Sequence, residues 1–140
     1  MILKPPPSHF LPALLAATVL LAGCQESAED FFSGRPSEMA MVHNRIIGGP
    51  PEAMLDLLRV PARFPDAKEA HIANWQESVI AWWRHAEKHE VMRASLPHLT
   101  PSETQALRAW VRVRDPHRSR EKAHDLDEVT AAIEAAPGIA

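Results

Sequence analysis

The chain has 140 residues and a formal net charge of −3, with 15 lysines and arginines against 18 aspartates and glutamates. This acidic balance argues against nucleic acid as a partner, because phosphate binding requires a basic face. The single cysteine excludes an internal disulfide and any iron–sulfur or zinc site built from several cysteines, so the fold must be stabilised by packing.

The N-terminal segment has the organisation of a secretory signal. Lys4 lies in a short n-region, and an apolar run from Phe10 to Ala22 follows it. The run has about thirteen residues, whereas a membrane-spanning helix needs roughly 20. It therefore predicts a signal h-region rather than a transmembrane anchor. The run ends in Leu21-Ala22-Gly23-Cys24.

This ending resembles the lipobox of bacterial lipoproteins. The resemblance implies cleavage between Gly23 and Cys24, a diacylglycerol on the Cys24 sulfur and an N-acyl chain on the new amino terminus. No other cofactor is expected. Two or three acyl chains give stable membrane attachment. An uncleaved signal anchor, or a chance cysteine after an ordinary cleavage site, is the alternative.

Gln25 directly follows Cys24, and in lipoproteins the residue at this position indicates the membrane to which the protein is sorted. In that class an aspartate after the cysteine favours retention at the inner membrane, and this chain has glutamine there. The expected location is therefore the outer membrane, facing the periplasm. The inner membrane and the cell surface are alternatives.

Three parts are predicted: a signal peptide over 1–23, a lipidated cysteine with a flexible tether over 24–50, and a helical domain over 51–140. Cleavage leaves 117 residues, close to a common single-domain size, and loss of Lys4 makes the net charge −4. The tether lacks a period of 2 or 3.6, and a coil of about 26 residues spans roughly 30 Å. The aromatic side chains of Phe31 and Phe32 are expected to pack onto the domain rather than to contact lipid.

The first two expected helices lie in 51–94. Pro51 can occupy the first position of a helix of about two turns, which Pro61 should end. Asp66 has the position of a cap for a second helix over 66–94, roughly 40 Å long.

Two more helices are expected in the C-terminal part. Thr100 and Glu103 form a capping box for a helix that ends at 115–116. Ser119 or Asp125 can cap a last helix that ends near 137–138. Strand patterns are weak. The predicted fold class is all-α, a three- to four-helix bundle after a disordered N-terminal tether.

Three tryptophans follow the helical spacing of the 66–94 segment. Trp75, Trp82 and Trp83 lie on or beside an apolar stripe that also contains Ile72 and Val79. Such a stripe favours a hydrophobic core. The alternative is a partly exposed tryptophan platform that binds a partner.

The histidines of the same segment are candidate metal ligands. His85 and His89 are one helical turn apart, and His71 lies on nearly the same side. Two imidazoles hold zinc, copper or nickel when a third group completes the site. Half-covered boundary histidines are the favoured interpretation, and acid–base chemistry is a further alternative. A weaker second cluster comprises His117, Glu121, His124 and Asp125.

The chain contains no sequence motif of an enzyme. It lacks a glycine-flanked serine and a phosphate-binding glycine loop, so we expect it not to be an enzyme. The anchor and the lack of catalytic residues predict a lipid-anchored, periplasm-facing interaction, accessory or inhibitor module with an unidentified protein partner. The alternative function is a metal-binding or metal-sensing lipoprotein. A purely structural spacer is disfavoured, because no long heptad rod is present.

Overall fold

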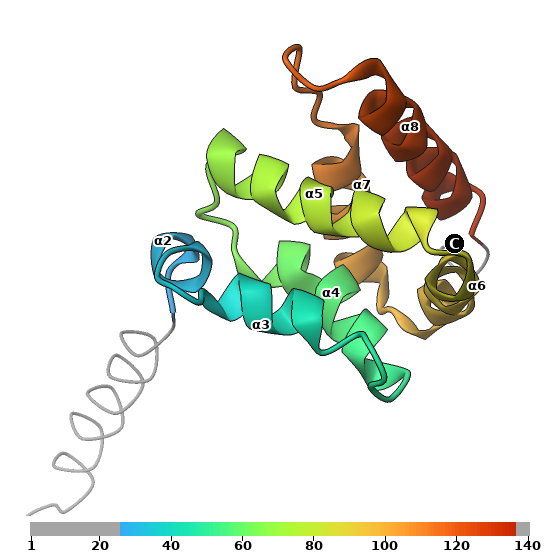
Figure 1. Ribbon diagram of the computed structural model, residues 1–140, viewed down its shortest axis with the longest axis horizontal. Coiled ribbons are helices and arrows are strands. Elements are labelled where there is room, and N and C mark those ends of the chain that lie inside the picture. Colours follow the sequence, from blue (N-terminus) through green and yellow to red (C-terminus); the bar gives the residue numbers. More distant parts are fainter. Residues whose placement is uncertain (1–25, 137–140) are drawn as a thin grey trace, which may run out of the picture.

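The computed structural model describes residues 26–136, and within them every regular element is a helix (Figure 1). The all-α prediction is therefore confirmed. The count of three to four helices is wrong, because the described residues contain seven α-helices and one 3₁₀ turn. Their bounds are α2 Ala28–Phe32, α3 Glu38–Asn44, α4 Glu52–Arg63, α5 Glu69–Arg84, α6 Ala86–Ser95, η1 Leu96–His98, α7 Pro101–Arg112 and α8 Arg120–Glu134. The predicted signal peptide lies outside the described residues.

Helices α2 and α3 correct the prediction of a flexible tether. The side chains of Ser27 and Ser37 cap them, each accepting a hydrogen bond from the backbone N–H three residues on. Both helices contribute buried side chains to the core, namely Ala28, Phe31, Met39 and Val42. The helices are too short to show a period in the sequence, and packing stabilises them instead.

Phe31 and Phe32 attach α2 to the rest of the domain, as expected from the interpretation that these rings pack onto it. The Phe31 ring lies 4.6 Å from the Phe64 ring, and the Arg63 guanidinium is 4.7 Å from the Phe31 centroid. Asp66 accepts a 3.0 Å hydrogen bond from the backbone N–H of Ala28. Asp66 therefore holds α2 and does not cap α5.

Helix α4 continues through Pro61, where the sequence predicted its end. A proline in a helix removes the N–H that would bind the carbonyl four residues earlier, here that of Leu57. The indole N–H of Trp75 donates to this carbonyl at 2.9 Å. A side chain from α5 thus supplies the hydrogen bond that Pro61 cannot make, and the helix extends to Arg63.

The long helix predicted over 66–94 is divided at His85. This residue has φ −81° and ψ 112°, an extended conformation that separates α5 from α6. The change of direction lets α6 pack against α4 and bury Met92. A straight helix of about 40 Å would have run past α4 without covering it.

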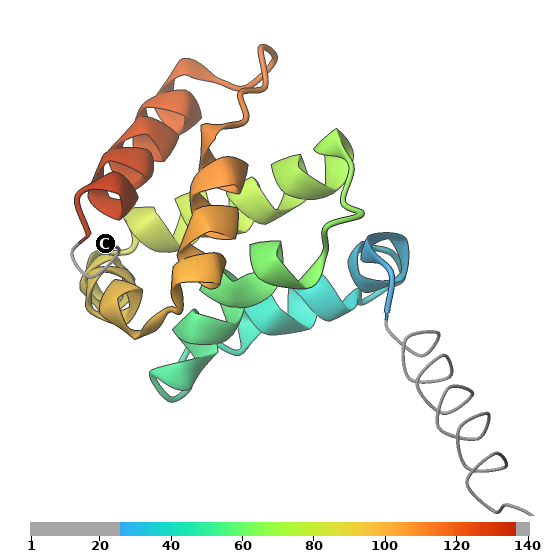
Figure 2. The same cartoon turned by 180° about the vertical axis from the view of Figure 1, so that it is seen from behind.

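Helix α7 begins where its cap predicted, and α8 begins after the first of its two candidate caps. The hydroxyl of Thr100 accepts from the N–H of Glu103 at 3.1 Å, and the Glu103 carboxylate accepts from the N–H of Thr100 at 2.9 Å. Ser119, rather than Asp125, caps α8. Helix α5 contacts α2, α6, α7 and α8, and so forms the centre of the domain. Figures 1 and 2 place α2 at one side of the molecule and α6 and α8 at the other.

Candidate functional site

Trp75, Trp82 and Trp83 belong to the core. Their exposed fractions are 0%, 5% and 5%, so they offer no surface platform, and the partner-binding prediction for them is wrong. Trp75 packs edge-on against Trp110 at 5.5 Å. The indole N–H of Trp82 is buried and has no hydrogen-bond partner among residues 26–136.

His71, His85 and His89 are not brought together, and the metal site predicted from them is therefore wrong. Nδ1 of buried His71 accepts from the N–H of Lys68 at 3.0 Å, and its Nε2 lies 3.1 Å from Glu29. These contacts, with stacking on Phe32, occupy the ring in joining α2 to α5.

The other two histidines lie at the α5–α6 junction and within α6. His85 is exposed in the turn itself. His89 stacks on Trp83 with ring centroids 3.6 Å apart, and its Nε2 accepts from Arg93 at 3.2 Å. The His89 N–H still donates to the His85 carbonyl at 2.8 Å, but His85 has an extended backbone and its ring is exposed, whereas the His89 ring is occupied by Trp83 and Arg93.

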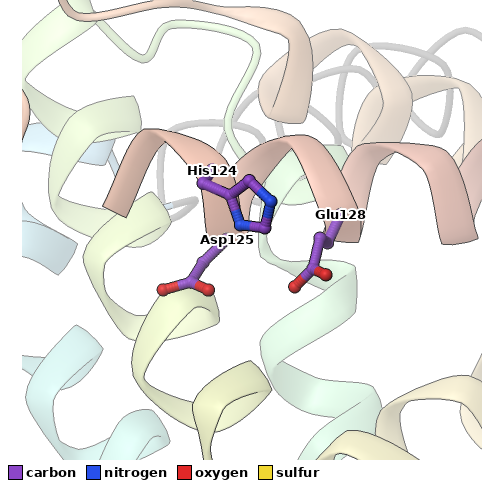
Figure 3. Close-up of side chains that lie close together, drawn as sticks. All are labelled: His124, Asp125 and Glu128. Carbon is purple, nitrogen blue, oxygen red and sulfur yellow. The ribbon is translucent and has the colours of Figure 1, made fainter. Parts of the chain in front are cut away.

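Helix α8 carries the group of side chains best arranged to hold a cation. His124, Asp125 and Glu128 each place one ligand atom within 4.8 Å of the other two. Figure 3 shows the imidazole and the two carboxylates next to one another along the helix. The weaker sequence cluster contained His124 and Asp125 but omitted Glu128. The spacing of four residues from His124 to Glu128 was the signal that could have identified it.

Two side chains of α5 hold the carboxylates of this α8 cluster. The indole N–H of Trp83 donates to Oε1 of Glu128 at 3.2 Å. Arg84 forms an ion pair with Asp125 and lies 3.9 Å from Glu121. The hydrogen bond to Asp125 raises the pKa of Arg84 above its ordinary value. Both carboxylates are thus oriented from a neighbouring helix.

A shallow depression of about 480 Å³ adjoins the cluster. Five side chains of α5 and α8 line it: Arg84, Arg120, Glu121, His124 and Asp125. The imidazole of His124 is exposed, so one face of the cluster is open to solvent. A small ion or a partner's side chain can therefore approach it directly.

A second depression, of about 290 Å³, lies between α3 and α5. Nδ1 of His43 lies 2.5 Å from the Ser78 hydroxyl at its wall, and burial lowers the pKa of His43. Burial raises the pKa of neighbouring Glu77, but the hydrogen bonds and positive charges of Lys122 and Arg118 outweigh it and lower the pKa overall.

The His43–Ser78 contact does not form a nucleophilic site. A serine nucleophile requires a base oriented by a third group. Among the described residues, no carboxylate hydrogen-bonds to the other nitrogen of His43, and Ser78 lies within α5 with 7% exposure. The contact is best explained as one that holds α3 on α5.

Comparison with known proteins found no matching family model, no matching curated protein and no matching solved structure. Within residues 26–136, none of the helices has the length and apolar character needed to cross a membrane. The case for function therefore rests on the residues of this chain.

Proposed function

We propose that the chain is a lipid-anchored accessory protein of the bacterial envelope, which binds another protein and catalyses no reaction. The ending Leu21-Ala22-Gly23-Cys24, which resembles a lipobox, supports the anchor. The proposed location is the outer membrane, with the domain in the periplasm.

The observation that carries this proposal is the position at which the folded domain begins. Ser27 caps α2, and Ala28 is fully buried in the core. Ala28 lies four positions after Cys24, and a fully extended chain spans at most about 14 Å over that interval. A lipid on Cys24 would hold the domain against the bilayer, whereas the predicted tether allowed roughly 30 Å.

This short connection defines two faces of the anchored domain. The α2 side would lie next to the lipid headgroups, and α6 and α8, across the molecule, would face away from them (Figures 1 and 2). The exposed side chains near the anchor include Glu29 and Asp30, which anionic headgroups do not attract. Attachment would therefore depend on acyl chains, at about 0.8 kcal/mol per buried methylene.

The anchor is tested by Cys24→Ser in the full-length protein, expressed in a bacterium with two membranes. We expect the wild-type protein to carry lipid by mass spectrometry and to fractionate with the outer membrane. Cys24→Ser should lose the lipid, the cleavage before residue 24 and the membrane association. Gln25→Asp is the matched variant: it should keep the lipid and move to the inner membrane. An unchanged mature mass and fractionation for Cys24→Ser would contradict the proposal.

The interaction role is tested by photo-crosslinking in intact cells. A photoreactive residue at Ala131, exposed on α8, should give a discrete protein adduct. The same residue at Asp30, exposed on α2, should crosslink to lipid. Adducts to lipid from both positions, or no protein adduct at Ala131, would exclude a partner-binding face on α8.

The alternative function, a metal-binding lipoprotein, was predicted from His71, His85 and His89. These three histidines lie in different environments and therefore do not support it. A different group on α8 is the observation that favours metal binding.

A further inference from the structure

We propose that His124, Asp125 and Glu128 on α8 form a binding site for a divalent transition-metal ion, with zinc as the representative ion. The site goes beyond the proposed anchoring and partner-binding role and does not depend on it. The ligand set is one imidazole nitrogen and two carboxylate oxygens. Zinc accepts this combination, whereas magnesium prefers oxygen ligands and retains most of its water.

The spacing of the ligand atoms suits a single ion. Three atoms at most 4.8 Å apart fit on a circle with a radius of about 2.8 Å, and zinc lies about 2.0–2.2 Å from nitrogen and oxygen ligands. Each ligand atom therefore needs to move inward by less than about 0.8 Å. His124 and Glu128 are exposed and Asp125 is half-buried, and side chains at the surface make such movements by small torsional changes.

Neighbouring side chains already orient the two carboxylates. Hydrogen bonds from an outer shell fix metal ligands and commonly change metal affinity by about 10- to 100-fold. Trp83, which is 5% exposed, donates one such bond to Glu128 from the core. A carboxylate has two oxygens, so this bond leaves an oxygen of Glu128 for the ion.

Arg84 both orients Asp125 and competes for it. Its guanidinium pairs with Asp125, and its positive charge opposes a cation at the same place. Asp125, Glu128 and nearby Glu121 carry three negative charges against the two positive charges of Arg84 and Arg120, so the local balance is still negative and favours a divalent ion. Removing the charge of Arg84 should therefore tighten binding, which is the opposite of what a purely structural ion pair predicts.

Three protein ligands leave at least one coordination position for water or for a partner's side chain. The cluster lies on α8, across the domain from α2 (Figure 1). The site therefore lies away from the end of the domain that would be anchored.

The site is tested by calorimetric titration of the full-length protein, in detergent, with zinc chloride and separately with magnesium chloride. We expect one zinc ion per chain and no comparable binding of magnesium. His124→Gln should weaken zinc binding by at least tenfold. The matched control is His98→Gln, another exposed histidine outside the cluster, which should leave the affinity unchanged.

Arg84→Gln provides a result of opposite sign, since it should strengthen zinc binding. Zinc should also raise the melting temperature of the wild-type protein but not that of His124→Gln, because a ligand that binds the native state stabilises it. Circular dichroism should show that each variant is folded. Cys24→Ser should bind zinc as the wild type does, so failure of the anchor and failure of the metal site are distinguishable.

Three outcomes would overturn the metal site. They are no zinc binding by the wild-type protein, equal weakening by His124→Gln and His98→Gln, or zinc-induced stabilisation that persists in folded His124→Gln; weaker binding by Arg84→Gln would overturn only the competing role of Arg84.

Discussion

Replacing Phe31 with alanine asks whether α2 is an integral part of the domain. The Phe31 side chain is 1% exposed and lies against Phe64 and Phe32, with Arg63 over its ring. If 24–50 were a flexible tether, this substitution would leave the stability of the domain unchanged. In the observed packing it removes an aromatic ring from the core.

The expected loss follows from the buried ring. Truncation of a buried phenylalanine to alanine costs about 3–5 kcal/mol, because the lost transfer free energy is increased by the cavity that remains. Complete burial and contact with two other rings place Phe31 near the middle of that range, at about 4 kcal/mol. For about 110 folded residues the total free energy of unfolding is roughly 5–15 kcal/mol, so the variant loses a large fraction of it.

Urea denaturation of the purified protein, followed by tryptophan fluorescence, measures this loss. With an m value of about 2 kcal/mol per molar urea, 4 kcal/mol lowers the midpoint by about 2 M. Met41→Ala is the matched control, because Met41 lies on α3 with 44% exposure. Its effect should stay within about 0.5 kcal/mol. A Phe31→Ala midpoint equal to that of Met41→Ala would refute the packing of α2 described above.

Three further experiments test other contacts. Trp75→Phe leaves the Leu57 carbonyl without its donor and should lower the free energy of unfolding by about 2 kcal/mol. In the double variant, Pro61→Ala should recover about half of that loss by restoring a backbone N–H. Strictly additive unfolding free energies would refute the coupling. Gly49→Ala places a Cβ 2.0 Å from the Arg45 carbonyl oxygen and should lower the free energy of unfolding by about 2–3 kcal/mol. Gly48→Ala, at φ 65° in open space, should lower it by about 1 kcal/mol. Equal melting temperatures for the two variants would contradict the close approach at Gly49. Burial lowers the pKa of His43, so the unfolded state takes up a proton there at a higher pH than the folded state does. The stabilising contribution of neutral His43 is therefore complete above about pH 6.5 and is lost as the pH falls toward the folded-state pKa. His43→Gln should reduce the dependence of the unfolding free energy on pH between about 7 and 5, and an unchanged slope would exclude this role.

The candidate site shows how far residue spacing alone can lead. The histidine spacing 85–89 predicted a pair of ligands on one helix, but that spacing has meaning only if the backbone stays helical at His85. His124 and Asp125 were recognised as a weaker cluster, and Glu128 was missed although it lies one turn beyond His124. The bonds from Trp83 and Arg84 join residues 45 and 41 positions apart, and no local pattern predicts them.

The sequence by itself determined the helical class and the start of α7, it limited the start of α8 to two candidate caps, and it favoured burial of the Trp75 stripe. Each of these is encoded within a few residues: a cap and its partner are three positions apart, and a helical face repeats every three to four. The contact between Thr100 and Glu103 is therefore present in the sequence before the chain folds.

The tertiary structure alone decided that residues 28–46 join the core, that α4 passes through Pro61, and that the helix turns at His85. In each case a distant group changes the local preference. Phe64 covers Phe31, the Trp75 indole supplies the donor that Pro61 lacks, and α4 provides the surface onto which α6 packs. These contacts join segments that are far apart in the chain. Their free energies exceed the fraction of a kilocalorie per residue that local helix propensity supplies.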